Sequence, residues 1–305
     1  MFHITTLKTV AAPLNSGVLA LIATLIMWAS YFVALRSGAQ SSLTGFDMAL
    51  LRFLLPALLL LPVVIRSRHK ILQVKKRYLM GIMFGAGLPF YLLSVLASGH
   101  VQAVIGSLLV PGVAPVFVTL LAVCCYKERL TKRRITGLSI VLAGIAVLLA
   151  STNSGYSEQS YFGYLFYILA ALCWSTYTVS VKMAQLSGLE LAAVLNSSAA
   201  VVLLLVMPTQ YFSSNLMQAP LSVVLPQLVI MGFFCGLVTV VTYTHAINNL
   251  GAELSACWGA LTPVLVSLMA FLILHESLDT PTIMAMVLIT FGVICANFKR
   301  KRKFK

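Results

Sequence analysis

Long apolar runs, separated by short clusters of charged and turn-forming residues, occupy almost the whole chain. Each run has at least 18 residues, the length that an α-helix needs to cross a hydrocarbon layer about 30 Å thick. Because backbone groups in hydrocarbon must be hydrogen-bonded within their own segment, the runs are predicted to be helices. The alternating pattern of a membrane β-barrel is absent. The polar boundaries predict ten spans: 16–36, 45–65, 78–98, 101–125, 134–151, 161–182, 189–211, 222–246, 251–274 and 281–298.

The order of residues within these runs repeats itself. Five residues of the first half return 148 positions later, and four residues nearer the N-terminus return 146 positions later, one of them with arginine replaced by lysine. Self-similarity in two ordered registers predicts a duplicated unit of about 150 residues. The pairs are Pro115 and Pro263, Glu128 and Glu276, Leu130 and Leu278, Ile135 and Ile283, Gly144 and Gly292, Trp28 and Trp174, Tyr31 and Tyr177, Arg36 and Lys182, and Pro62 and Pro208.

Composition agrees with an integral membrane protein of the all-α class. Hydrophobic residues make up 60% of the chain and charged residues 9%, with a mean hydropathy of +0.98, whereas charged residues are about 25% of a soluble domain. The net charge of +14 does not indicate a nucleic-acid partner, because the basic residues flank the predicted helices. The expected partners are the lipid bilayer and a small-molecule substrate.

The six cysteines all lie inside apolar runs, without CxxC spacing and without a histidine partner. This favours small packing residues over a disulfide or a metal site. Residues 1–15 are too polar for the hydrophobic core of a signal peptide. No metal, cofactor or catalytic residue is therefore expected.

The distribution of lysine and arginine predicts the orientation of the chain. If the N-terminus is cytoplasmic, 19 of the 21 basic residues fall on the inner side, and only Arg36 and Arg52 fall on the outer side. In a bacterial inner membrane this predicts a cytoplasmic N-terminal segment (1–15), a periplasmic linker (152–160) and a basic cytoplasmic tail (299–305).

Each half, 16–151 and 161–298, has five spans, so the second half enters the membrane in the opposite sense to the first. The charges agree, since the loop K-E-R-L-T-K-R-R after the fourth span has the counterpart H-E-S-L-D-T, which lacks lysine and arginine. The prediction is ten transmembrane helices arranged as two inverted five-helix repeats. Such repeats are common in secondary transporters, where the substrate binds between them near the membrane midplane.

Three stretches resemble the EamA-type members of the ten-helix drug/metabolite transporter superfamily. They are L-I-M-W-A-S-Y-F-V-A-L in the first span, A-L-L-R-F-L-L-P-A-L-L-L-L-P in the second, and the twice-used pattern of Pro, Glu, Leu and a distal Gly. The resemblance covers about 16–298. It implies transport of small molecules without ATP hydrolysis, most often export of amino acids, other metabolites or toxic compounds, and it does not imply one substrate.

Four aromatic residues are candidates for the wall of a substrate cavity. Trp28 and Tyr31 share one helical face, and Trp174 and Tyr177 are their repeat partners. Across a pseudo-two-fold axis they would bind a flat or cationic ligand by stacking or cation–π contact. The alternative is an interfacial belt that anchors helices at the headgroups.

The third and eighth spans each carry a G-x-x-x-G motif, followed about six residues on by a tyrosine. The glycines favour close helix packing. Polar side chains near them need partners or water inside an apolar span, so they are candidates for the transport path. The motifs are Gly81/Gly85 and Gly232/Gly236, and the candidate substrate-binding residues are Tyr91, Ser94, Thr239 and Tyr243.

Two titratable or charged side chains are candidates for a proton or anion site. His245, near the end of the eighth span, would carry a proton or bind a carboxylate, or it is an inert hydrogen-bonded residue. Arg52 lies about seven residues into the second span, where it would attract an anionic substrate group. Alternatively it extends to the interface or pairs with Asp47.

The remaining candidates are mainly structural. Trp258 is a candidate cavity residue on the ninth span, just before Pro263. Pro115 and Pro263 are predicted to bend their helices. Glu128 and Glu276 are expected to cap the following helix or to pair with neighbouring bases.

The function favoured by these observations is a secondary transporter, with export of an amino acid or related metabolite by alternating access as the first hypothesis. Uptake or exchange of a nucleoside-like metabolite and multidrug efflux stay open, as do coupling to protons or a counter-substrate and a monomeric or homodimeric state. An intramembrane lipid-modifying enzyme is disfavoured, because the spans lack metal-ligand motifs and an acid/base set.

Overall fold

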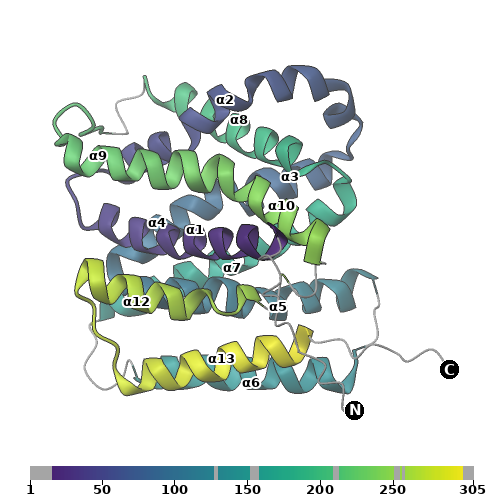
Figure 1. The fold of residues 1–305 in the computed structure, drawn as a ribbon, viewed down its shortest axis with the longest axis vertical. Coiled ribbons are helices and arrows are strands. Elements are labelled where there is room, and N and C mark those ends of the chain that lie inside the picture. Colours follow the sequence, from purple (N-terminus) through teal and green to yellow (C-terminus); the bar gives the residue numbers. More distant parts are fainter. Residues whose placement is uncertain are drawn as a thin grey trace, which may run out of the picture.

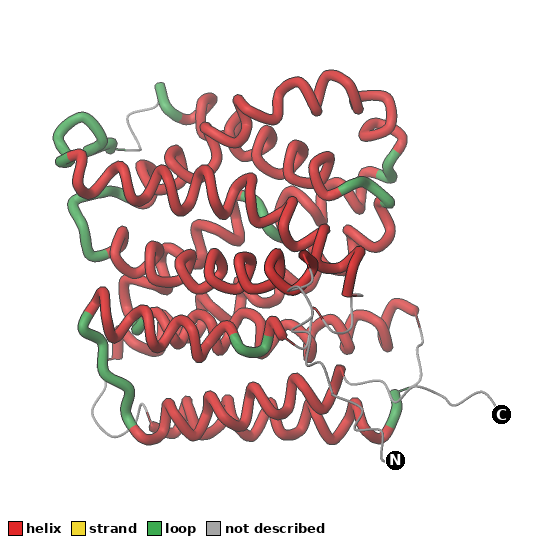
Figure 2. Tube along the Cα trace, in the orientation of Figure 1, coloured by secondary structure: helices red, strands yellow, loops and turns green. Residues whose placement is uncertain are grey.

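The computed structural model describes residues 16–126, 130–151, 158–208, 213–250, 255 and 258–297, and the structural statements below refer to these. The described chain is a stack of helices joined by short loops, without a strand (Figures 1 and 2). The first half contains α1 (Ser16–Ala39), α2 (Gly45–Gln73), α3 (Lys76–Gly85), α4 (Leu88–His100), α5 (Ala103–Tyr126) and α6 (Lys132–Ser151).

The second half has the same plan with different interruptions. Residues 221–250 form a continuous rod of three elements, of which the middle one, η2, is an 11-residue π-helical segment. The elements are α7 (Glu158–Ala184), α8 (Gly188–Val206), α9 (Leu221–Gln227), η2 (Leu228–Val238), α10 (Thr239–Leu250), α12 (Thr262–Leu274) and α13 (Thr280–Asn297).

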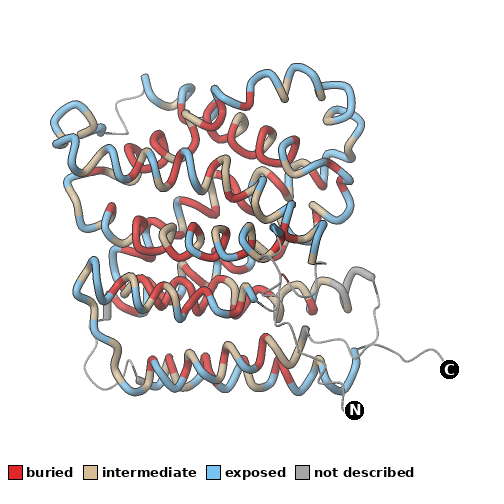
Figure 3. Tube along the Cα trace, in the orientation of Figure 1, coloured by how far each residue is buried: buried red, intermediate tan, exposed pale blue. Residues whose placement is uncertain are grey.

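The described helices have the length and composition of membrane spans. Eight helical stretches in the described part of the chain are long and apolar enough to cross a bilayer, with Lys76–His100 and Leu221–Leu250 each counted as one, and α12 and α13 are shorter apolar helices. Buried residues gather in the middle of the stack, and exposed ones toward its outer ends (Figure 3). Large apolar side chains such as Leu58, Leu205 and Phe271 are exposed. This confirms the prediction of an all-helical, multi-pass membrane protein.

The helices pack across the two halves of the chain in a reciprocal way. The last helices of the halves, α6 and α13, lie against each other, and so do the second helices, α2 and α8. The first helix of the first half, α1, packs on η2, α10 and α12 of the second half. The first helix of the second half, α7, packs on α3, α4 and α5 of the first half. Exchanging the halves therefore reproduces the main contacts.

Glycines allow several of these contacts to be close. A Cβ atom at Gly292 in α13 would lie 2.8 Å from the Gly137 carbonyl oxygen and the Val141 nitrogen in α6. At Gly144 in α6 it would lie 2.8 Å from Ile289 in α13. The repeated glycines of the sequence motif thus sit where the two final helices meet backbone to side chain or backbone to backbone.

The two G-x-x-x-G motifs also serve packing, as predicted. A Cβ atom at Gly85 in α3 would lie 2.5 Å from the Tyr177 backbone nitrogen in α7. At Gly232 in η2 it would lie 2.5 Å from the Leu51 carbonyl oxygen in α2. Helix α3 therefore meets the backbone of α7 at Gly85, and η2 meets the backbone of α2 at Gly232.

Capping boxes begin both α2 and α8. The Thr44 hydroxyl accepts a hydrogen bond from the Asp47 nitrogen, and Asp47 accepts one from the Thr44 nitrogen. Ser187 and Glu190 do the same at the start of α8. These boxes satisfy backbone donors that an α-helix leaves unpaired at its N-terminus. The sequence analysis did not identify them, although T-G-F-D and S-G-L-E carry the signature.

The third predicted span, 78–98, is broken in the structure. Ala86 and Gly87 separate α3 from α4, and a Cβ atom at Gly87 would collide with the Met83 carbonyl oxygen. Helix α4 then begins with Pro89 in its first turn, where the missing N–H leaves no hydrogen bond unmade. Gly87 and Pro89 thus account for the break between α3 and α4.

The two structural prolines lie in different settings. Pro115 is inside α5, where the Thr119 hydroxyl donates to the Pro115 carbonyl oxygen at 2.6 Å. Pro263 lies in the first turn of α12, which begins at Thr262. The predicted span 251–274 therefore does not contain a helix that bends at Pro263, since a new helix starts there. Residues 251–254 and 256–257 lie outside the described part of the chain.

Candidate functional site

Aromatic rings of the two halves contact each other at two places. Trp28 of α1 packs against Tyr243 of α10, with ring centroids 4.9 Å apart and an interplanar angle of 54°. Both side chains are partly exposed, so the pair has a face that other groups can reach. The predicted candidates Trp28 and Tyr243 are thus brought together by the contact of α1 with α10.

In a second aromatic group the tryptophan lies on the second half and a partner ring lies on the first half. Trp174 of α7 packs against Phe90 of α4 at 5.4 Å and against Tyr177, one turn on, at 5.2 Å. Each tryptophan therefore contacts an aromatic residue on the third span of the other half. The sequence analysis expected Trp174 and Tyr177 but did not identify Phe90, which lies one residue before the candidate Tyr91.

Tyr31 extends this aromatic surface toward polar groups. Its ring meets Phe32 edge-on at 5.2 Å. Its hydroxyl is fully buried beside the Ser94 side chain, and it makes no hydrogen bond of regular geometry to the described residues. An unsatisfied buried hydroxyl is unfavourable by about 1–3 kcal/mol, so this group has an unused capacity to donate or accept.

Arg52 of α2 points toward α8 and η2. Its Nη1 donates to Asn196 Oδ1 at 3.3 Å, and its guanidinium lies 5.0 Å from the centre of the Phe53 ring. Gly236 of η2 faces it, because a Cβ atom there would lie 3.0 Å from Nη1. Asp47 does not pair with Arg52, since it accepts hydrogen bonds from Thr44 and from the 214–215 segment instead.

Three candidate residues already use their hydroxyls within the fold. Tyr91 is buried and donates to the Met48 carbonyl oxygen at 3.1 Å. Ser94 donates to the Phe90 carbonyl oxygen at 2.8 Å. Thr239 donates to the Phe234 carbonyl oxygen at 2.9 Å. These three hydroxyls are therefore satisfied within the fold.

Two other candidates have at least a third of their surface exposed. His245 is exposed, and its Nε2 is 3.1 Å from the Ser16 hydroxyl at the start of α1. Trp258 is 37% exposed and lines a groove of about 270 Å³ between α1 and α12. The groove has an entirely apolar lining, which includes Ile22, Leu25, Ile26, Leu261, Val264 and Leu265.

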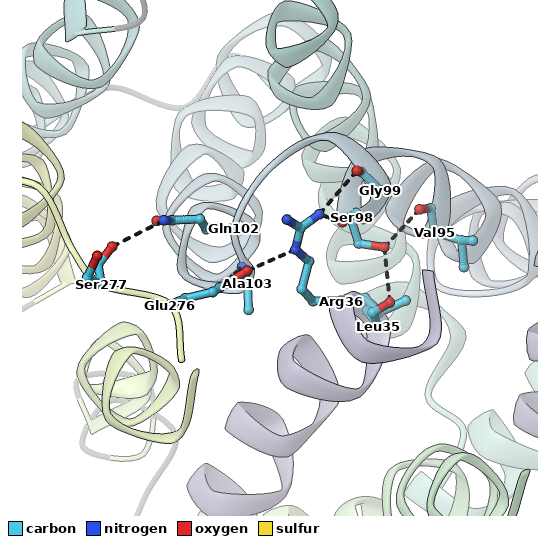
Figure 4. Close-up of polar contacts among 9 residues, drawn as sticks. All are labelled: Leu35, Arg36, Val95, Ser98, Gly99, Gln102, Ala103, Glu276 and Ser277. Carbon is cyan, nitrogen blue, oxygen red and sulfur yellow. Dashed lines mark hydrogen bonds and ion pairs between the residues drawn. The ribbon is translucent and has the colours of Figure 1, made fainter. Parts of the chain in front are cut away.

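An ion pair joins the two halves at the end of α1 (Figure 4). Arg36 Nε donates to Glu276 Oε1 at 2.9 Å, and Arg36 Nη1 donates to the carbonyl oxygens of Ser98 and Gly99. The other carboxylate oxygen, Oε2, accepts from the Ala103 nitrogen at 3.0 Å. Glu276 therefore satisfies a backbone donor at the start of α5, where a negative charge is favourable.

This contact resembles one part of the sequence-based expectation and differs in another. Glu276 was expected to pair with a neighbouring base, but its base comes from the first half, 240 positions away in the chain. The alternative expectation was that it caps the following helix; in the structure it instead accepts a hydrogen bond from the first turn of α5. Its repeat partner Glu128 lies outside the described residues.

The ion pair is the centre of a wider polar seam. Gln102 Nε2 donates to the Ser277 carbonyl oxygen at 3.1 Å, which adds a second bond between the same two segments. The Ser98 hydroxyl is bonded to the Leu35 and Val95 carbonyl oxygens. The seam thus connects α1, the α4–α5 junction and the α12–α13 connection. Among the described residues, no group of three or more His, Cys, Asp or Glu side chains gathers as metal ligands do.

Comparison with known proteins matches both halves of the chain. The model of the EamA-like transporter family matches residues 15–150 and again residues 161–298. A protein of Streptantibioticus cattleyicolor named "Probable terminal-alkyne amino-acid exporter" is 26% identical over 268 residues, covering 86% of this chain and 87% of that protein. An "Uncharacterized transporter" of Clostridium kluyveri is 24% identical, covering 95% of each chain.

A solved crystal structure has a similar fold. It superposes with a TM-score of 0.61 at 20% sequence identity and covers 92% of this chain and 97% of that one. Because the family model matches nearly the entire chain, once in each half, the chain belongs to the EamA-like transporter family.

Proposed function

We propose that the protein is a secondary transporter that moves an amino acid or a related metabolite outward by alternating access. The observation that carries this proposal is the reciprocal packing of the halves, in which α1 lies among second-half helices and α7 among first-half helices. Two such bodies that rock against each other would open a shared site to one side of the membrane and then to the other.

The proposal includes ten spans in two inverted repeats. Support comes from the five matched helical regions of each half, with the shorter α12 and α13 completing the second half. The lysine and arginine distribution supports cytoplasmic termini in a bacterial inner membrane. In this orientation the Arg36–Glu276 pair lies at the periplasmic end of α1.

We assign substrate contact to the aromatic groups on α1, α7 and α10. Trp28, Tyr31 and Tyr243 form one part of the wall, and Trp174 and Tyr177 form the other. Their partly exposed rings supply apolar, stacking surface, and the adjoining polar groups supply orientation. The exporter named among the relatives acts, by its name, on an amino acid with a terminal alkyne, which supports an amino-acid class of substrate here.

The Arg36–Glu276 pair is proposed to close the periplasmic end of the path. It joins α1 to the α12–α13 connection, and these segments belong to different halves. Outward opening would separate them, so the pair would break and re-form in each cycle. Its two bonds to Ser98 and Gly99 would hold Arg36 on the first half when Glu276 leaves.

Counterflow in proteoliposomes tests the proposed function. Vesicles that contain purified protein and a high internal concentration of one amino acid should accumulate the same labelled amino acid from outside, without ATP. Replacing both Trp28 and Trp174 by alanine should slow this uptake by about tenfold or more, because two stacking surfaces are lost. Failure of folded wild-type protein to move any member of a panel of amino acids and analogues would contradict the proposal.

A further inference from the structure

Arg36 and Arg52 are the two basic residues outside the inner loops, and they differ in what neutralises them. Arg36 has a carboxylate partner, Glu276. Arg52 has an amide partner, Asn196. The described carboxylates are occupied elsewhere: Asp47 at the start of α2, Glu190 by Lys70 and Ser187, Glu276 by Arg36, and Asp279 by the Thr282 nitrogen. None of these four carboxylates, whose side chains the structure describes, pairs with Arg52.

The surroundings of Arg52 hold it in the interior. Asn196 is 1% exposed, and its amide nitrogen donates to the Ala192 carbonyl oxygen at 2.7 Å and to the Gly236 carbonyl oxygen at 3.4 Å. These bonds turn its Oδ1 toward the guanidinium. Arg52 therefore faces α8 and η2. Asn196 positions the arginine.

Most of the hydrogen-bonding capacity of Arg52 is unused. A guanidinium has five N–H donors, and one of them makes a described hydrogen bond, to Asn196 Oδ1 at 3.3 Å. An arginine within a membrane span is unfavourable by about 2.5–3.5 kcal/mol even on the mildest scales. A bound anion would offset this by supplying both the missing charge and the missing acceptors.

A second unused group lies on α1, next to the η2 segment that Arg52 faces. The Tyr31 hydroxyl is buried and lacks a regular hydrogen bond among the described residues. Its helix, α1, and the helix of Arg52, α2, both pack on η2, where Gly236 faces Arg52 Nη1 and the Cys235 thiol donates to the Met27 carbonyl oxygen, one turn before Tyr31. Tyr91 is also nearby, since its ring packs edge-on at 5.3 Å against Phe53, the residue after Arg52. The Tyr91 hydroxyl is bonded to Met48, so Tyr31 is the neighbour with a free donor.

We propose that Arg52 and Tyr31 form a carboxylate-binding subsite, which rests on the proposed function and assigns the class of its substrate. The guanidinium binds the two carboxylate oxygens side by side, and the tyrosine hydroxyl donates to one of them. The apolar body of the substrate lies on the aromatic surface that begins at Tyr31. One arginine balances one negative charge, so the subsite fits a monocarboxylate and disfavours a phosphate dianion.

Ligand binding to the purified, full-length protein in detergent tests this subsite without transport. Phenylacetate carries a carboxylate on an apolar body, and phenylacetamide is its neutral counterpart of nearly equal shape. Thermal stabilisation and quenching of tryptophan fluorescence measure the affinity for each ligand. The wild-type protein should bind phenylacetate at least about tenfold more tightly than phenylacetamide, the ratio expected for a charged hydrogen-bonded pair.

Variants then locate the preference. Arg52→Gln should lower the affinity for phenylacetate about tenfold or more and leave phenylacetamide unchanged, which removes the preference. Tyr31→Phe keeps the Arg52 charge and removes only the hydroxyl, so it should lower the affinity for phenylacetate a few-fold. Arg66→Gln removes an exposed arginine from the same helix and should leave the preference intact. These results would support the subsite even if no amino acid is transported.

Three results would overturn the subsite. The first is that the wild type binds phenylacetate no better than phenylacetamide. The second is that Arg52→Gln keeps the wild-type preference for phenylacetate. The third is that Arg52→Gln lowers the affinity for both ligands equally while Tyr31→Phe leaves the preference unchanged. If amino-acid counterflow occurs but the protein does not prefer phenylacetate to phenylacetamide, only the subsite is rejected. If the protein prefers phenylacetate but shows no counterflow of any amino acid, only the proposed function is rejected.

Discussion

At the scale of single residues, the two described ion pairs differ in their exposure to water. In the Arg36–Glu276 pair the side chains are 15% and 11% exposed. In the Lys70–Glu190 pair, Lys70 is 51% exposed and Glu190 12%. A shielded pair is screened little, and loss of one partner leaves an uncompensated charge, whereas an exposed lysine exchanges its partner for water.

We therefore expect a strong coupling between Arg36 and Glu276. Arg36→Gln or Glu276→Gln alone should each lower the Tm in detergent by about 5 °C or more, because the remaining charge is left in the seam. The double variant should lose clearly less than the sum of the single losses. A double-mutant cycle on thermal unfolding measures this coupling.

The matched control is the Lys70–Glu190 pair, examined with Lys70→Gln, Glu190→Gln and the double variant. Here the coupling should be below about 1 kcal/mol, because Lys70 is half in solvent. Additive losses at Arg36 and Glu276, or equal coupling in the two cycles, would show that shielding does not distinguish the two pairs.

Residue-level features were only partly predictable. The sequence analysis selected Arg36 and Glu276 through the repeat pattern, since each has a counterpart in the other half. It could not pair them, because they are 240 positions apart and belong to helices whose packing partners are not encoded locally. Asn196 and Phe90 were missed for a related reason. A single amide or phenylalanine in an apolar span carries no signal until the facing helix is known.

At the scale of helices, α6 and α13 depend on glycine for their close contact. Gly292→Ala would place a Cβ atom 2.8 Å from a backbone oxygen and a backbone nitrogen of α6, and a backbone has no rotamer with which to yield. We expect a loss of about 1–3 kcal/mol, seen as a lower Tm in detergent. The mechanism is separation of the two helices.

Gly99→Ala is the control for this substitution. A Cβ atom at Gly99 in α4 meets nothing within 4 Å, so the change should be neutral or stabilise the helix by up to about 1 kcal/mol. Equal destabilisation by the two substitutions would indicate a general intolerance of alanine. Close packing of α6 on α13 would then not explain why Gly144 recurs as Gly292 in the second half.

The sequence predicted where helices occur better than where they end or bend. Apolar length and charged boundaries place the spans, because hydrocarbon permits few other structures. The end of the predicted span 189–211 is wrong, since α8 ends at Val206. The break at Ala86–Gly87 and the π-helical η2 were also missed. Gly87 and Pro89 mark the break locally, whereas nothing in a single apolar run distinguishes a π-helical from an α-helical segment.

At the scale of the whole molecule, the reciprocal contacts and the two capping boxes suggest how the halves are related. In α2 the box Thr44–Asp47 is held by Ser214 and Asn215 from the segment after α8. In α8 the box Ser187–Glu190 is held by Lys70 from the end of α2. Each helix thus has its start secured by the far end of the other, as expected for two antiparallel partners.

Cysteine labelling tests whether the halves are inverted, because these boxes supply a matched pair of loops. Ser42 and Gln185 each lie two residues before an N-cap residue, and both are exposed. In a variant without the six native cysteines, Ser42→Cys should react with a membrane-impermeant maleimide in intact cells. Gln185→Cys should react only after the membrane is opened, since inversion places it on the cytoplasmic side. Labelling of both positions from the same side would mean that the halves are parallel, and a rocking exchange between inverted repeats could then not move the substrate.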